Sequence, residues 1–322
     1  YLESWYAAVE GTRKVGDSHK LRIGQHLANI VAGIGHIKIQ SLQVSDVLTL
    51  RKKLQNKHAP RTIKQMEITL KAAIMDGLKH GVLSSSPEIF RLQCFKTNPL
   101  TLAEEEEVQV FEPSEQKTLI DAARLYAEEH DPRWLIIPIL GLHTGMRKGE
   151  MYALQGKHIN LAAKQIRVEQ SLEYSKGDTN GRLKTTKTKN GKRTIFISNM
   201  LCEEISRYQL WVKKLGLKMR RKANENDFLV FHDDYGPLHK SAPQTRWNTI
   251  LRRAALEHRG MHALRHTHAS NMIDAGMNIK MLSKRLGHGS INITLDTYGH
   301  IYKKQGEEQT LQALEKWQAQ TF

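Results

Sequence analysis

Arginines, histidines and a late tyrosine recur in short motifs that suit chemistry on a phosphodiester. Arg147 stands in Thr-Gly-Met-Arg-Lys-Gly-Glu (144–150), and Arg265 stands in His-Ala-Leu-Arg-His (262–266). A guanidinium is always charged and binds two phosphate oxygens as a fork. Leu-Gly-His (286–288) and Asp-Thr-Tyr-Gly-His (296–300) add an imidazole and a phenol. This set could hold the charge of a phosphate while the phenol attacks it.

The elements expected around the arginines would direct them to a common ligand. His262 and Arg265 are three residues apart on a predicted helix, so their side chains share one face. Arg147 follows a Thr-Gly helix stop and precedes an apolar helix, so we expect it at a helix start, where backbone N–H groups also face anions. Taken singly, Arg147 is equally typical of an exposed turn, and Glu150 of a first-turn acid that the helix dipole favours.

The tyrosine motif leaves two interpretations open. Tyr298 follows His288 on a predicted amphipathic helix, where Ile291, Leu295 and Tyr302 would share its face. Tyr298 could therefore be a core residue, and Tyr302 is a rival nucleophile. His288 could simply be a histidine that suits the dipole at a helix C-terminus.

A lysine-rich segment could supply a proton donor. Strand-like stretches are expected at 165–170 and 183–189, and Asn190-Gly191 predicts a tight hairpin turn into a strand over 192–198. Strand alternation places Lys187 and Lys189 on the same face, so spacing does not choose between them.

The rest of the sequence predicts helices in two regions. Apolar residues at helical spacing indicate a helix over 63–78, with Pro60 before it and Gly81 after it, and a second from Ser45 to Leu54. After a segment without helical period come predicted helices over 114–129, 132–145, 199–215, 244–258, 262–275, 278–286 and 290–302, with an amphipathic tail helix over about 303–322. The fold class expected is mainly α with a small antiparallel sheet.

Charge favours a polyanionic partner. Lys and Arg total 49 against 33 Asp and Glu, a formal charge of +16 that both halves of the 322-residue chain share. Two cysteines exclude a disulfide framework, and no apolar run reaches the length of a membrane span. No metal-ligand spacing is found. The basic residues on the first two helices are either DNA contacts or a solvated face: Arg51, Lys52, Lys53, Lys57, Arg61 and Lys64.

The order Arg, His-x-x-Arg, His and Tyr resembles the tyrosine recombinases of the phage-integrase family, over nearly the whole chain. The resemblance implies a helical core-type DNA-binding domain at 1–98, a linker at 99–110 and a mixed α/β catalytic domain at 111–322. It implies catalytic roles for Arg147, Lys187, His262, Arg265, His288 and Tyr298, with Glu150 and His266 in support. Thr186 stands where the family often has proline before the lysine.

The resemblance also implies how the protein works. Tyr298 would join a DNA 3′-phosphate, without metal, cofactor or ATP, in a homotetramer on paired attachment sites of a phage or other mobile element. A small directionality factor and a host DNA-bending protein are expected partners, in a bacterial cytoplasm at the nucleoid. Integrases of this branch of the family often carry a further N-terminal arm-binding domain. No segment of this sequence matches that domain, so we expect a chain that starts after it.

Three other functions remain open from the sequence. A type IB topoisomerase shares the chemistry but relaxes supercoils. A DNA-binding regulator could keep the fold without catalysis, although every matched position is filled here. A metal-dependent nuclease could use some of the 16 histidines.

Overall fold

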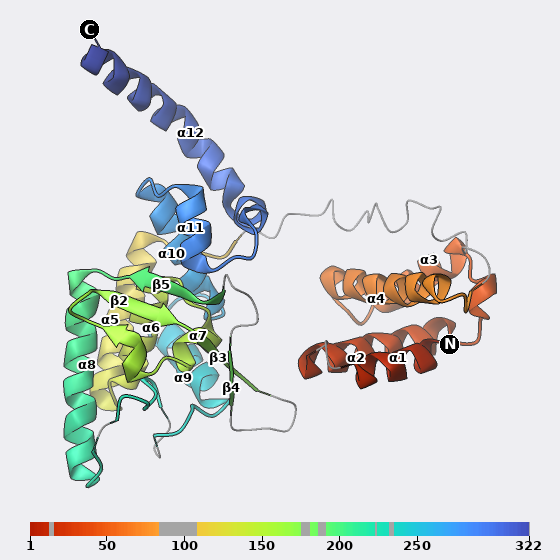
Figure 1. Ribbon diagram of the computed structural model, residues 1–322, viewed down its shortest axis with the longest axis horizontal. Helices are drawn as coiled ribbons and strands as arrows, with labels where there is room; N and C mark the ends of the chain where they lie inside the picture. The colour runs from red at the N-terminus through yellow and green to blue at the C-terminus, as the bar shows by residue number, and fades with distance from the viewer. Residues whose placement is uncertain are drawn as a thin grey trace. The chain divides into compact units, whose positions relative to one another are not determined.

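The computed structural model describes residues 1–12, 16–83, 108–174, 181–185, 191–222, 224–231 and 235–321 (Figure 1). The chain divides into two compact units, Tyr1–Glu107 and Val108–Phe322. Most of the predicted linker at 99–110 lies outside the described residues.

The described part of the first unit is helical. Its elements are α1 (Leu2–Gly11), α2 (Asp17–Ile34), the 3₁₀ turn η1 (Ile39–Ser41), α3 (Val44–Gln55) and α4 (Pro60–Lys79). Pro60 opens α4, whose Ile63, Met66, Leu70 and Ile74 are buried, as the helical spacing predicts. α3 begins at Val44, one residue before the expected start at Ser45. Gln43 caps the helix, because the Asp46 carboxylate accepts a hydrogen bond from the Gln43 N–H at 2.9 Å.

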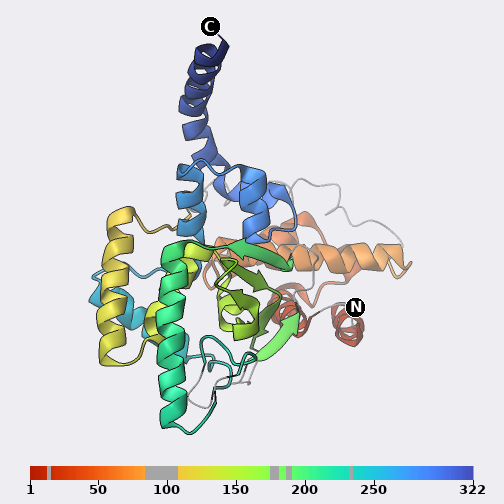
Figure 2. The ribbon, with the colours of Figure 1, turned by 60° about the vertical axis from the view of Figure 1, so that its left-hand side comes forward.

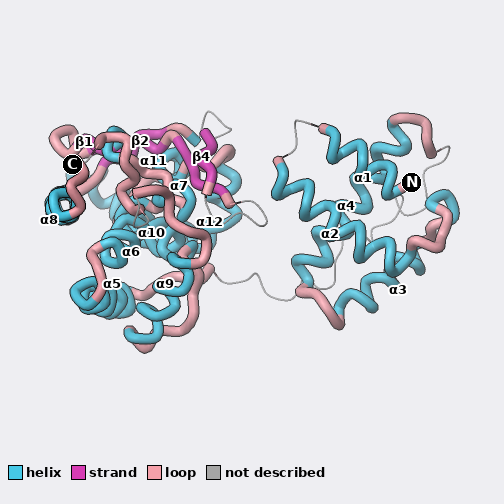
Figure 3. Tube along the Cα trace, turned by 90° about the horizontal axis from the view of Figure 1, so that it is seen from below, coloured by secondary structure: helices cyan, strands magenta, loops and turns pink. Residues whose placement is uncertain are grey.

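The second unit is mainly helical, with all the strands found in the described residues (Figure 3). This confirms the predicted fold class. Its helices are α5 (Pro113–Glu129), α6 (Arg133–Thr144), α7 (Lys148–Tyr152), the 3₁₀ turn η5 (Gly156–His158), α8 (Asn199–Lys218), α9 (Ala242–Arg253), α10 (His262–Asp274), α11 (Ile279–Leu286) and α12 (Ile291–Thr321). Its strands are β1 (Ile159–Asn160), β2 (Gln165–Val168), β3 (Gln170–Glu173), β4 (Arg182–Thr185) and β5 (Arg193–Phe196).

The strands pair differently from the prediction. β2 lies between β1 and β5, while β3 pairs with β4, both antiparallel. The expected hairpin between 183–189 and 192–198 is therefore wrong, since β4 and β5 belong to different sheets. The stretch predicted as one strand over 165–170 ends at Val168, and β3 begins a separate pairing in which buried Leu172 faces Leu183. Asn190, the first residue of the expected turn, lies outside the described residues.

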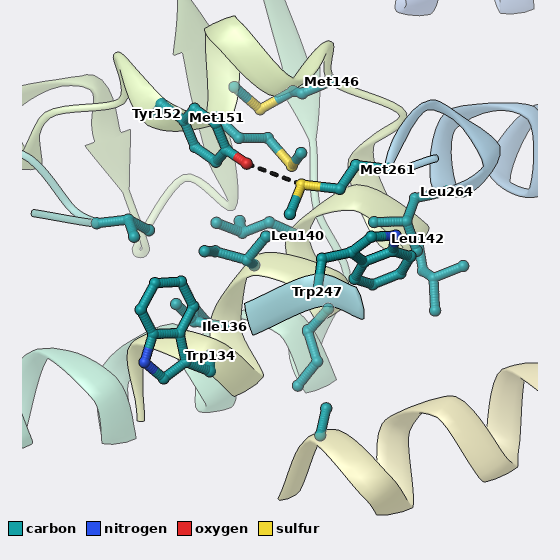
Figure 4. Close-up of a cluster of buried hydrophobic side chains, with 14 of the residues drawn as sticks. Trp134, Ile136, Leu140, Leu142, Met146, Met151, Tyr152, Trp247, Met261 and Leu264 are labelled. Atoms are coloured by element: carbon teal, nitrogen blue, oxygen red, sulfur yellow. Dashed lines mark hydrogen bonds between the residues drawn. The ribbon is translucent and has the colours of Figure 1, made fainter. Parts of the chain in front are cut away.

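The core of the second unit lies around α6, which carries a run of buried apolar residues (Figure 4). A Cβ at Gly141 would lie 2.7 Å from Leu264 Cδ1 on α10, so α6 and α10 pack closely because Gly141 has no side chain. At the end of α7, the Tyr152 hydroxyl donates to Met261 Sδ at 2.8 Å (Figure 4). These contacts fix α10, which carries Arg265, and α7, which begins directly after Arg147.

The last two predicted helices form one. α12 runs without a break from Ile291 to Thr321 and projects from the rest of its unit (Figures 1 and 2). Near its end, Leu314 and Trp317 are exposed. Among the residues that can be described, none of the helices has the length and apolar character of a membrane span.

Candidate active site

Arg147 lies where α6 gives way to α7. α6 ends at Gly145, whose φ of +63° lets the chain reverse without steric strain. Arg147 then caps α7, and its N–H donates to Glu150 Oε2 at 2.9 Å. Its guanidinium donates from Nη1 to Glu150 Oε1 at 3.0 Å, and its side chain remains 42% exposed. The helix-start prediction for Arg147 therefore describes the geometry found.

Arg265 lies on α10 and is 2% exposed. Its Nη1 donates to Gly145 O and its Nη2 to Leu286 O, both at 2.8 Å. Burial, followed by the charge of Arg147, lowers the pKa of Arg265 to about 9, so it stays cationic at neutral pH. These contacts use two of the five N–H donors of a guanidinium.

The turn between α11 and α12 closes the site opposite Arg147. Gly287 ends α11 with φ +69°, and its carbonyl accepts a hydrogen bond from Arg147 Nη2 at 3.2 Å. His288 follows, with Nδ1 2.7 Å from Thr294 Oγ1. Burial, then the charges of Arg265, Arg147 and Arg193, lower the pKa of His288 to about 4, so its ring is neutral.

His262 and His266 lie one turn apart on α10, with ring centroids 4.6 Å apart. The His262 side chain is exposed, but neighbouring protein atoms reduce the solvation of its ring. This desolvation, followed by the charges of Arg265 and Arg147, lowers the pKa of His262. Burial and the neighbouring His262 lower the pKa of His266 to about 4. A neutral imidazole has one unprotonated nitrogen, so either ring can accept a proton.

Tyr298 lies on α12 and is 1% exposed. Its ring packs in a small apolar cluster with α10 and α11, and its hydroxyl lies 2.8 Å from His266 Nδ1. Burial raises the pKa of Tyr298 to about 12, although the charge of Arg265 opposes the shift. Tyr298 is therefore a core aromatic, and its hydroxyl also meets a potential base, while its role as nucleophile stays a prediction. The rival Tyr302 instead donates to Met277 O at 2.8 Å.

Sequence reasoning missed Arg193, the first residue of β5. Its Nη1 and Nη2 donate to the two oxygens of Glu150 at 3.1 and 2.8 Å, and its side chain is 5% exposed. The signal was present in the strand period, which places Arg193 on the same face as the buried Ile195. A charged residue on a core face requires a partner charge.

The assignment of the proton donor to Lys187 stays a prediction, with Lys189 as the alternative. Lys187 and Lys189 both lie outside the described residues. Of the other lysines in the segment, Lys184 pairs with Glu173 at 2.7 Å, and Lys192 is exposed.

The basic residues predicted to contact DNA lie on α3, on α4 and, for Lys57, in the turn between the two helices. Arg51 differs from the prediction, because it is 7% exposed and its Nε donates to the buried Glu67 at 2.6 Å. Position 51 lies on the apolar face of α3, between Leu50 and Leu54, so its charge serves an internal ion pair. The remaining five are exposed, as phosphate contact requires: Lys52, Lys53, Lys57, Arg61 and Lys64.

The geometry brings two cations, a neutral imidazole and a phenol–imidazole pair to one place. Four segments distant in sequence converge there: the α6–α7 turn, β5, α10 and the α11–α12 turn. Such a set can hold an anion and move a proton from a hydroxyl. No group of side chains suited to a metal occurs in the parts of the chain that are described.

Comparison with known proteins gives concordant matches. The sequence profile described as the phage integrase family matches residues 109–305. The chain is 28% identical to a XerC-like tyrosine recombinase of Caldanaerobacter subterraneus subsp. tengcongensis, over 83% of this chain and 68% of that protein. It is 29% identical to the ICEBs1 integrase of Bacillus subtilis, over 51% of this chain and 44% of that protein. The latter match thus spans less than half of its relative.

Solved structures share the fold. The Tn1549 transposon integrase in complex with transposon right end DNA superposes with a TM-score of 0.75 at 19% identity, over 92% of this chain and 94% of that one. The lambda integrase tetramer bound to a Holliday junction gives 0.63 at 16% identity, over 92% of this chain and 76% of that one.

Proposed function

The chain belongs to the phage integrase family, and on this basis we propose that it is a site-specific DNA recombinase that cuts and rejoins duplex DNA through a phosphotyrosine link. The observation that carries the proposal is the convergence of Arg147 and Arg265 beside a tyrosine hydroxyl that meets a neutral imidazole. The matched relatives, named as recombinases, integrases and transposases, support it.

In the proposed reaction, Arg147 and Arg265 neutralise the non-bridging oxygens of the scissile phosphate. The Tyr298 oxygen attacks phosphorus, and its proton passes to His266 Nδ1. A phosphotyrosine bond to the DNA 3′ side forms as the bond to the 5′ oxygen breaks. That oxygen takes a proton from Lys187, the residue that the family motif favours.

Rejoining reverses these steps. A 5′ hydroxyl attacks the phosphotyrosine and releases Tyr298, so the bond energy is retained and no ATP is consumed. His262 and His288 lie beside the arginines, and each neutral ring can donate its N–H to a phosphate oxygen. Neither metal nor cofactor has a step in this scheme.

Tyr298 must become accessible for attack to occur. Its 1% exposure keeps a DNA phosphate from the hydroxyl in the state described. DNA binding would therefore have to shift the α12 segment that carries Tyr298, at the cost of its packing against α10 and α11. The same cost would protect DNA from cleavage by an unassembled protein.

The partners proposed are duplex attachment sites of a mobile element and three further copies of the chain, as in the lambda integrase tetramer bound to a Holliday junction. A directionality factor and a host DNA-bending protein would assist in the bacterial cytoplasm. The first unit would grip duplex backbone through the exposed lysines of α3.

The test is capture of the covalent intermediate. A duplex selected by binding from a random library is nicked near its centre and incubated with the protein in EDTA, and adducts are resolved on a denaturing gel. Tyr298→Phe should bind the duplex and give no adduct. Tyr302→Phe, which also removes one hydroxyl and one hydrogen bond, should still give it. The reverse pattern would transfer the role to Tyr302.

Two further outcomes distinguish the rival functions. A wild-type protein that cuts only with added divalent metal would be a nuclease. A protein that relaxes supercoils but never joins two different duplexes would be a topoisomerase.

A further inference from the structure

Glu150 is a buried carboxylate held between two guanidinium groups. It is 3% exposed, and its oxygens accept from Arg147 Nη1 at 3.0 Å and from Arg193 at 3.1 and 2.8 Å. Burial would raise the pKa of Glu150, but the hydrogen bonds and charge of Arg193, followed by those of Arg147, lower it overall. The carboxylate is therefore ionised at neutral pH.

The two arginines differ in what else they can reach. Arg193 is 5% exposed and binds Glu150 through both terminal nitrogens, whereas Arg147 is 42% exposed and uses one. A lone carboxylate beside Arg147 would cancel much of its charge, since opposite charges in contact attract strongly away from water. Arg147, Glu150 and Arg193 together keep one net positive charge, and Arg147, the exposed member, places that charge toward solvent.

Arg193 also reaches the turn on the far side of the site. Its Nε donates to Arg285 O at 2.6 Å, and a Cβ at Gly287 would lie 2.8 Å from its Nη1. Gly287 O is the second acceptor of Arg147. One side chain thus joins β5, the first turn of α7 and the end of α11, which together set the position of Arg147.

We propose that Arg193 is a positioning residue of the recombination reaction. It holds the Glu150 carboxylate, and so keeps Glu150 from neutralising the charge of Arg147 and keeps the Arg147 guanidinium directed toward the scissile phosphate. The inference rests on the proposed function, and it assigns Arg193 no contact with DNA.

A charge-paired mutant cycle tests the proposal. The proteins are wild type, Arg193→Met, Glu150→Gln and the double variant, with Arg207→Met on α8 as a control that loses one exposed arginine. Each is assayed for duplex affinity and for the rate of adduct formation on the nicked duplex. Thermal unfolding confirms that each protein is folded.

Arg193→Met leaves Glu150 to compete with the phosphate for Arg147. The adduct rate should fall by about 100-fold, a loss like that of one oxyanion donor, while duplex affinity stays within about threefold. The double variant removes both charges and should recover at least about tenfold of that loss. Arg207→Met should match wild type. A double variant no faster than Arg193→Met, with both folded, overturns the proposal.

A second substrate separates positioning from a general loss of structure, and Arg193→Lys supplies a milder variant if Arg193→Met does not fold. Replacing a non-bridging oxygen of the scissile phosphate by methyl removes its negative charge. A defect that acts through Arg147 should shrink on this methylphosphonate, whereas a defect in folding should be equal on both substrates. Equal defects overturn the proposal. Absence of any adduct with wild type would instead count against the proposed function.

Discussion

His268 links α10 to the end of α6 through a hydrogen bond, and its protonation should lower the free energy of unfolding of the second unit as the pH falls. It is 1% exposed, three residues beyond Arg265 on α10. Its Nδ1 lies 2.8 Å from Leu142 O, and Arg285 Nε donates to its Nε2 at 3.0 Å. These partners require a neutral ring with the proton on Nδ1.

The size of the effect follows from the pKa. Burial, followed by the charge of Arg285, lowers the pKa of His268 to about 3, against about 6.5 for an ordinary histidine. The unfolded chain therefore binds this proton at a higher pH than the folded chain. The stability supplied by the neutral ring is complete above about pH 6.5 and is lost progressively toward about pH 3. The slope is about 1.4 kcal/mol per pH unit, or about 2 kcal/mol between pH 6.5 and 5.

The assay is urea unfolding at several pH values between about 7 and 5, followed by tryptophan fluorescence. Trp134, Trp211, Trp247 and Trp317 all lie in the second unit. His268→Gln should lower the free energy of unfolding at pH 7, because it breaks the contacts above. It should also flatten the fall toward pH 5 by about 2 kcal/mol relative to wild type.

The control is His258→Gln, which changes an exposed histidine between α9 and α10. Its pH dependence should follow that of wild type. If His268→Gln and wild type lose stability in parallel between pH 7 and 5, the ring is not held neutral, and the account of how α10 is fixed to α6 fails.

Two other changes test the turn between α11 and α12 and the proposed contacts of α3 with DNA phosphates. Gly287→Ala places a Cβ on a residue with φ +69°, 2.8 Å from Arg193 Nη1, so it should cost about 1–2 kcal/mol of stability and slow adduct formation. Gly289→Ala is the control and should do neither, because nothing lies within 4 Å of its added Cβ. The double change Lys52→Ala with Lys53→Ala should reduce the salt slope of log K for duplex DNA by about 1.8, and an unchanged slope would mean a solvated face.

Much of the fold could be predicted because its helices are locally encoded. The period of α4, with Pro60 at its start, places its buried face correctly. The same local logic places Arg147 at the start of α7 with Glu150 in the first turn. Glycines after Thr144 and Leu286 end α6 and α11 where a left-handed residue is required.

Features that depend on distant contacts could not be predicted in this way. Strand partners are chosen by tertiary packing, so the Asn190-Gly191 signal did not reveal that β4 pairs with β3 and β5 with β2, in different sheets. Arg51 has the same charge as its neighbours Lys52 and Lys53 in the sequence. Its contact with Glu67 of α4 shows that Arg51 faces inward. The role of Arg193 depends on a carboxylate 43 residues earlier.

The two glycine turns have a further electrostatic consequence for Arg265. Its guanidinium donates to Gly145 O at the end of α6 and to Leu286 O at the end of α11. The C-terminus of a helix carries the partial negative end of its macrodipole, so two helices direct negative potential at one buried cation. These backbone dipoles are fixed and cannot be protonated. Unlike a carboxylate, they offset the burial of the cation without forming an ion pair, so a phosphate that bound Arg265 would displace no counter-ion among the residues that the structure describes.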